Sequence, residues 1–138
     1  MLRAIFALCA GLFAALIVYT ISAGIAQHAW PPTGVDLRDP AQIAAFVAAL
    51  PNTARLTLIA GPVLGSFFGA GVAAMLAAEA QRPFVSSLIG ALVAANTAFD
   101  WLHVGHPTWM LASGVVSCLL AALAAMLLVR KVSPAPGK

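Results

Sequence analysis

The sequence predicts an all-α integral membrane protein with four transmembrane helices, because very few charges accompany four long apolar runs. Of the 138 residues, 62% are apolar and only 8% are charged. Soluble domains carry roughly 25% charged residues, and a soluble fold could not cover its surface with so few. A helix needs about 20 mostly apolar residues to cross about 30 Å of hydrocarbon. Four segments meet this requirement: residues 4–26, 54–78, 84–102 and 108–129.

Residues 1–130 are expected to form a single transmembrane domain. The first apolar run, residues 4–26, is about 23 residues long. The apolar region of a signal peptide is shorter, about 7–15 residues, so we interpret this run as a retained span. Residues 131–138 lack the apolar side chains needed for a core and are predicted to be a flexible cytoplasmic tail.

The loop between the first two spans, residues 27–53, is predicted to contain a short outward-facing helix over residues 40–50. Asp39 is a suitable N-cap and Pro40 a suitable first helical residue, while Gln42 completes a start that resembles a capping box. The apolar side chains of this helix form one stripe: Ile43, Phe46, Val47 and Leu50. The helix is too short to span, so we expect it to lie flat at the lipid interface, as a lid on the spans or as a docking surface.

Basic residues and tryptophans predict how the chain is oriented. One side of the predicted membrane carries five basic residues: Arg3, Arg82, Arg130, Lys131 and Lys138. The other side carries only Arg38 and Arg55. Because cytoplasmic loops are enriched in Lys and Arg, both termini are expected in the cytoplasm. The three tryptophans all lie on the predicted outer side, at headgroup level: Trp30, Trp101 and Trp109. The composition indicates a bacterial inner membrane.

Small residues recur at every fourth position of the second predicted span: Gly61, Gly65, Gly69 and Ala73. Such a row forms a groove that lets another helix approach closely. The third span has the same spacing at Ser86, Gly90 and Ala94. We therefore expect the second and third spans to pack through these rows, within one chain or between two copies. Pro62 is expected to bend the second span, since it removes a helical hydrogen bond.

Polar side chains gather at the outer end of the third span. Asn96, Asp100 and His103 are spaced i, i+4, i+7 and share one stripe. His106 precedes Pro107, which disfavours the helical conformation there. One hypothesis is a divalent metal site or proton relay formed by three side chains: Asp100, His103 and His106, with His28 as a further ligand. Carboxylate and imidazole groups suit zinc, copper or nickel.

A structural interpretation competes with the metal site. Arg55 begins the second span at the depth of Asp100, so the two are expected to form an ion pair. The histidines would then be in contact with water among the lipid headgroups. The spacing D-x-x-H-x-x-H is a weak metal signal, because Gly105 and Pro107 break the helix that carries it.

Four features together resemble a family of small four-span bacterial inner-membrane proteins: H-A-W-P-P-T-G-V-D-L-R-D-P, F-V-A-A-L-P, the glycine-rich second span and H-P-T-W. The family typically shows a proline-rich segment after the first span, a short alanine-rich helix ending in L-P, and H-P-x-W opening the fourth span. These features correspond to Pro31–Pro40, Ala41–Pro51 and His106–Trp109. The second span departs from the family pattern, since it has G-P-V-L where an aromatic run is expected. The resemblance covers nearly the whole chain and implies the topology but no substrate.

The composition narrows the classes of function that the protein could have. The basic residues are scattered singly, which excludes nucleic acid as a partner. Cys9 and Cys118 are isolated and are interpreted as buried hydrophobic residues. The middle of every predicted span lacks an acidic or basic residue, which argues against a proton-coupled exporter. We therefore predict a non-catalytic scaffold, accessory or assembly subunit without a cofactor, whose partners are the lipid bilayer and another membrane protein or a second copy in a homo-oligomer.

Two alternatives belong to other classes. The first is a transporter or channel component for neutral or apolar small molecules, which needs no charge at depth. The second is a metal-binding or redox membrane enzyme that acts on the periplasmic side through Asp100, His103 and His106.

Overall fold

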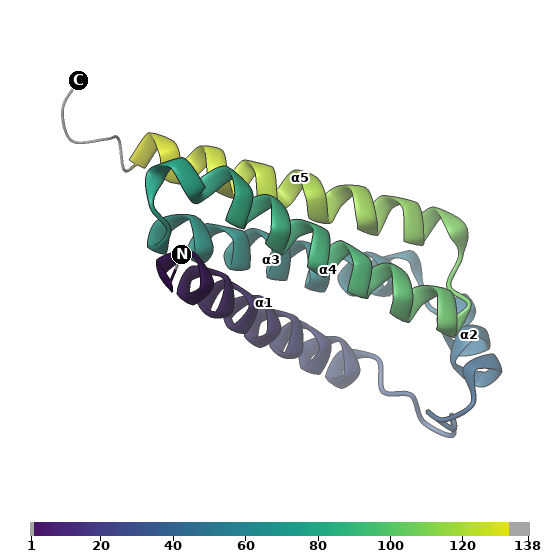
Figure 1. Ribbon diagram of the computed structural model, residues 1–138. Coiled ribbons are helices and arrows are strands. Elements are labelled where there is room, and N and C mark those ends of the chain that lie inside the picture. The colour runs from purple at the N-terminus through teal and green to yellow at the C-terminus, as the bar shows by residue number, and fades with distance from the viewer. Residues whose placement is uncertain (1, 133–138) are drawn as a thin grey trace.

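The computed structural model describes residues 2–132 and shows four long helices with one short helix between the first two (Figure 1). The long helices are apolar and long enough to cross a membrane: α1 (Leu2–Ala29), α3 (Asn52–Leu76), α4 (Arg82–Val104) and α5 (Thr108–Val132). A single 3-10 turn, η1 (Glu79–Gln81), precedes α4. The helices agree with the four predicted spans to within three residues at each end. Helix α5 continues into the predicted tail, of which residues 133–138 lie outside the described part.

The short helix α2 (Pro40–Ala49) begins as its sequence predicts. The Asp39 carboxylate accepts a hydrogen bond from the backbone N–H of Ala41 at 2.9 Å, and Pro40 is the first helical residue. Gln42 donates to the Asp39 carboxylate at 3.1 Å and accepts from the backbone N–H of Asp36 at 2.9 Å. This start therefore differs from a capping box, in which the glutamine oxygen would accept from the N-cap residue itself.

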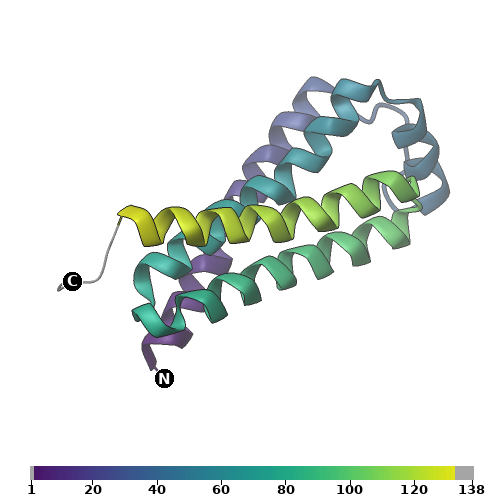
Figure 2. The same ribbon diagram turned by 90° about the horizontal axis from the view of Figure 1, so that it is seen from above.

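The long helices form two pairs that diverge. Helix α1 packs mainly on α3 and touches α4 only sparingly, whereas α5 packs on both α4 and α3. Seen from above, the pairs lie close together where the chain begins and ends and spread apart toward α2 (Figure 2). We call these two ends of the bundle the terminal end and the α2 end.

The predicted glycine row of α3 packs against α1, so the expected partner, the third span, is wrong. A Cβ atom on Gly69 would lie 2.7 Å from the carbonyl oxygen of Gly11 and 2.8 Å from the Cβ of Ala15. A Cβ on Gly65 would lie 3.0 Å from the carbonyl oxygen of Ala15. The reason is that α1 carries its own row of small buried residues, Ala7, Gly11 and Ala15, which fits the row of α3 backbone to backbone.

The other pair, and the link between pairs, also depend on small residues. A Cβ on Gly90 of α4 would lie 2.6 Å from the Cβ of Ala122 of α5. Helix α3 joins α5 where the Ser66 hydroxyl donates to the carbonyl oxygen of Cys118 at 2.7 Å. Around these contacts lies an alanine-rich core: Ala7, Ala70, Ala73, Ala77, Val85, Ile89, Ala122 and Ala125. Small side chains thus hold the helices closely together toward the terminal end.

At the α2 end, larger side chains and α2 itself fill the space between the helices. A second core cluster joins residues of four helices: Val47, Ile59, Trp101 and Met110. Arg55 at the start of α3 fastens α2 in place, because its guanidinium donates to the carbonyl oxygens of Val47, at 3.2 Å, and Ala48. These carbonyls lie in the last turn of α2, where backbone acceptors have no partner within the helix.

Candidate binding cleft

The polar residues singled out in the sequence do not gather into one group. Within residues 2–132, no three His, Cys, Asp or Glu side chains lie close enough to hold a metal ion. The exposed His103 has its Nδ1 2.9 Å from the carbonyl oxygen of Phe99 on its own helix, and its ring lies on the Phe99 ring. The ring of His106 instead stacks on Trp101, with centroids 5.4 Å apart. His28 is exposed near the end of α1.

The two members of the predicted ion pair have other partners. The hydrogen bonds of the Arg55 guanidinium go to the carbonyls of α2. The Asp100 carboxylate instead accepts a hydrogen bond from the side-chain amide of Asn96 at 3.1 Å, one turn earlier on α4. Asp100 therefore faces a different environment from Arg55, and that environment is a hollow between the helix pairs.

Two hollows share the lining residue Tyr19, and we call them together the cleft. The deeper hollow, of about 340 Å³, lies between α1, α3 and α4. The hollow at the α2 end, of about 270 Å³, is lined by α1, the following link, α2, α3 and α4. A small hollow of about 60 Å³ shares several lining residues with the second, among them Trp101 and His106. Each of the two larger hollows is near the size range of ligand pockets, roughly 300–1,000 Å³.

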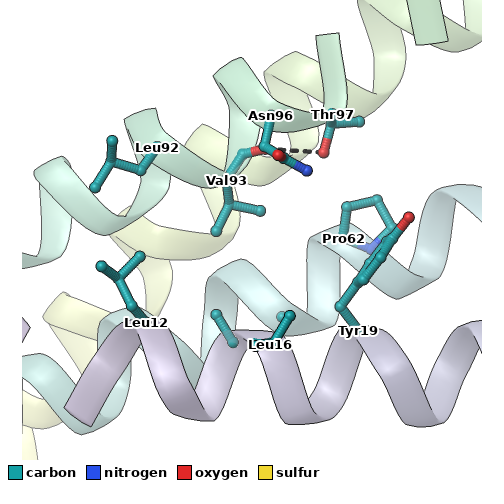
Figure 3. Close-up of a pocket in the computed structure, with 10 residues that line it drawn as sticks. Leu12, Leu16, Tyr19, Pro62, Leu92, Val93, Asn96 and Thr97 are labelled. Carbon is teal, nitrogen blue, oxygen red and sulfur yellow. Dashed lines mark hydrogen bonds between the residues drawn. The ribbon is translucent and has the colours of Figure 1, made fainter. Parts of the chain in front are cut away.

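The deeper hollow presents mainly hydrocarbon (Figure 3). Leu12, Leu16 and Tyr19 point from α1 toward α4, which contributes Leu92 and Val93. The polar members of this wall, Asn96 and Thr97, are engaged within α4: the Thr97 hydroxyl donates to the carbonyl of Val93 at 2.9 Å, and Asn96 bonds to Asp100. A molecule in this part of the cleft would meet chiefly apolar surface.

The hollow at the α2 end combines aromatic and polar side chains. Trp30 and Trp101 line it together with Gln27, Asp100 and His106. Asp100 is the only residue in this lining that is an Asp, Glu, Lys or Arg. The Nδ1 atom of His106 is buried without a hydrogen-bond partner in the described part of the chain. Burial lowers the pKa of His106 below its ordinary value of 6.5, so its ring is neutral at neutral pH.

The cleft is long compared with one leaflet of a bilayer. Its lining on α1 begins at Leu12 and extends to Gln27. At a rise of about 1.5 Å per residue, this stretch of helix measures roughly 22 Å. Half of the hydrocarbon core is about 15 Å thick. The cleft is therefore long enough for an extended tail with a polar head. Helices α1 and α4, which form two of its walls, make few contacts with each other.

Comparison of the chain with models of protein families, with curated proteins and with solved structures finds no match. The candidate site is therefore inferred from the arrangement of its residues in the structure. Sequence reasoning missed Tyr19, which lines all three hollows. The one available signal was that Tyr19 is the only tyrosine of the chain and lies inside an apolar run, where a hydroxyl needs a polar neighbour.

Proposed function

We propose that the protein binds an amphipathic, lipid-like molecule in the cleft, with the tail in the deeper hollow and the head at the α2 end. The observation that carries this proposal is the change in lining across two hollows that share Tyr19, from Leu12 and Leu16 in the apolar one to Gln27, Asp100 and His106 in the polar one. Ligand sites commonly combine a mostly apolar wall with a few polar groups that fix orientation. This function shares an apolar ligand body with the alternative of neutral or apolar small molecules, and the polar end of the cleft adds a polar head.

The proposed role is to hold the molecule rather than to convert it. In the deeper hollow the polar groups of Asn96 and Thr97 form hydrogen bonds within α4, so these hydrogen bonds are made to the helix rather than to a ligand. A holding role is compatible with the scaffold or accessory role that the composition favours. It also requires no cofactor.

The proposed setting is a bacterial inner membrane, with both termini in the cytoplasm and the α2 end outside. Four long apolar helices support a multi-pass protein, and their exposed surfaces carry many large apolar side chains, including Phe13, Leu64 and Leu120. The terminal end has a basic excess, to which Arg3, Arg82, Arg130 and Lys131 contribute, in accordance with the enrichment of Lys and Arg on the cytoplasmic side.

Filling the cleft tests the proposal. Ala23 lines the hollow at the α2 end, so Ala23→Leu would occupy ligand space. The neighbouring Gly24 has no atom within 4 Å of an added Cβ, which makes Gly24→Leu a matched control that adds bulk outside the cleft. Each protein is reconstituted in nanodiscs and exposed to a long-chain alcohol that carries bromine on the carbons next to its hydroxyl head. Bromine in the cleft would quench the fluorescence of Trp30 and Trp101, which line it.

Saturable quenching is expected for the unchanged protein and for Gly24→Leu, and strongly reduced quenching for Ala23→Leu. If Ala23→Leu does not fold, Leu12→Phe fills the deep end of the cleft instead without adding a tryptophan. Equal quenching in the filled and unfilled proteins would refute the cleft as the binding site, as would quenching that rises linearly with the probe content of the bilayer in every variant.

A further inference from the structure

We propose that the head of the bound molecule carries a positive charge, so that the cleft takes an amphipathic cation such as a long-chain amine or quaternary ammonium. Asp100 would be its counter-ion. This inference rests on the proposed binding in the cleft and adds the chemical class of the ligand.

The charge of the cleft is the first observation. Asp100 is the one formally charged side chain that lines either of the two larger hollows. Two basic residues directly follow lining residues in the sequence, Arg38 and Arg55, but neither lines a hollow. The Arg55 guanidinium is directed into the carbonyls of Val47 and Ala48. An anionic phosphate head would therefore lie beside a carboxylate with no basic lining residue to compensate it, which is unfavourable at short range.

The hydrogen bonding and partial exposure of the Asp100 carboxylate are the second observation. Asn96 donates to Oδ2 at 3.1 Å, which fixes the orientation of the group on α4. An ionised carboxylate offers about four acceptor positions on its two oxygens. One amide hydrogen bond therefore leaves Asp100 with capacity for a charged head, and its side chain is only partly exposed, which strengthens a charge pair relative to one in bulk water.

Aromatic rings around the same hollow are the third observation. Tyr19, Trp30 and Trp101 all line it, and aromatic faces attract ammonium groups, tryptophan most strongly. His106 stacks on Trp101 at an interplanar angle of 12° and thereby fixes the indole. Because the His106 ring is neutral at neutral pH, it adds no positive charge that would repel a cationic head.

The test compares three probes that share one hexadecyl tail, brominated on the carbons next to the head, and differ in the head: trimethylammonium, hydroxyl and phosphate. Each is added at pH 7.5 to the protein in nanodiscs of neutral lipid. The protein carries Trp109→Phe, since Trp109 does not line the cleft, so quenching reports Trp30 and Trp101. Affinities are compared between proteins for each probe separately, which cancels differences in how the probes partition into lipid.

Replacing Asp100 by asparagine should weaken binding of the trimethylammonium probe by about fivefold or more, the size expected for a partly exposed charge pair. Binding of the alcohol should change by less than about twofold. Asp36→Asn is the matched control, because it removes an acid near the same end that does not line the cleft and should leave both affinities unchanged.

The outcomes separate this inference from the proposed function. If Asp100→Asn leaves the ammonium probe unaffected, or if Asp36→Asn weakens it equally, the cationic head is refuted while alcohol binding still supports the cleft. If Asp100→Asn weakens binding of the phosphate probe as much as that of the ammonium probe, charge selection is also refuted. If no probe quenches saturably, both the inference and the proposed function fail.

Discussion

The contact between α1 and α3 should not tolerate a single methyl group at Gly69. A Cβ there would lie 2.7 Å from the carbonyl oxygen of Gly11, 2.8 Å from the Cβ of Ala15 and 3.2 Å from the Cγ2 of Ile89. The closest atom belongs to the backbone of α1, so the clash cannot be relieved by turning a side chain. Helix α1 would have to move away as a whole, and it forms one wall of the cleft.

The size of the effect follows from two opposing terms. Alanine is favoured over glycine inside a helix by about 0.8–1.0 kcal/mol. Overpacking a close contact costs about 1–3 kcal/mol. Gly24 on α1 has no neighbour within 4 Å of an added Cβ, so Gly24→Ala experiences the first term alone. The free energy of unfolding of Gly69→Ala should therefore be lower than that of Gly24→Ala by about 1–3 kcal/mol.

Equilibrium unfolding in mixed micelles, with helix content followed by circular dichroism, measures this difference. Gly69→Ala should unfold at a lower denaturant fraction than the unchanged protein, whereas Gly24→Ala should unfold at the same fraction or a higher one. A Gly69→Ala protein as stable as Gly24→Ala would show that α1 does not approach α3 this closely, and the wall of the cleft would then be misplaced.

Three further perturbations test the α2 end. Arg55→Met should speed backbone hydrogen exchange in α2, because carbonyls in its last turn lose a charged donor worth about 1.5–3 kcal/mol; Arg38→Met, outside this contact, should not. Asp39→Ala should weaken the start of α2 by about 1 kcal/mol. Backbone hydrogen exchange should then become faster in the first turn of α2 only, and an equal increase along the whole of α2 would contradict the role of Asp39 as a cap. Burial lowers the pKa of His106, so the unfolded chain binds this proton more readily than the folded protein. Its contribution to stability is full above pH 6.5 and is lost as the pH falls toward the lowered pKa. The melting temperature should drop between pH 7.5 and pH 5, and His106→Gln should lessen that drop; an undiminished drop would assign it to other groups.

The features that the sequence predicts well are local. The lengths of the apolar runs fix the four long helices, because a run that must cross hydrocarbon satisfies its backbone hydrogen bonds within itself. The start of α2 follows from Asp39 and Pro40, which act within one turn. Both kinds of signal depend on residues a few positions apart, so no knowledge of the packing is needed to interpret them.

The partner of the α3 glycine row could not be predicted in the same way. A row of small residues shows that another helix approaches closely, but any helix with a matching row satisfies it. Gly90 made α4 a plausible partner, yet Gly90 packs on Ala122 of α5. The matching row of α1, which includes Gly11 and Ala15, is hidden in an apolar stretch where small residues look like ordinary lipid-facing ones.

The cleft follows from how the two helix pairs are spaced at their two ends. Toward the terminal end, alanines such as Ala73 and Ala122 form the core, so the pairs can approach closely. At the α2 end, Trp101 and Met110 are buried together with Val47 of α2, and this larger volume keeps the pairs apart. Because Arg55 holds α2 in that position, loosening α2 should change the polar mouth of the cleft and leave its apolar depth, beside the α1–α3 contact, in place.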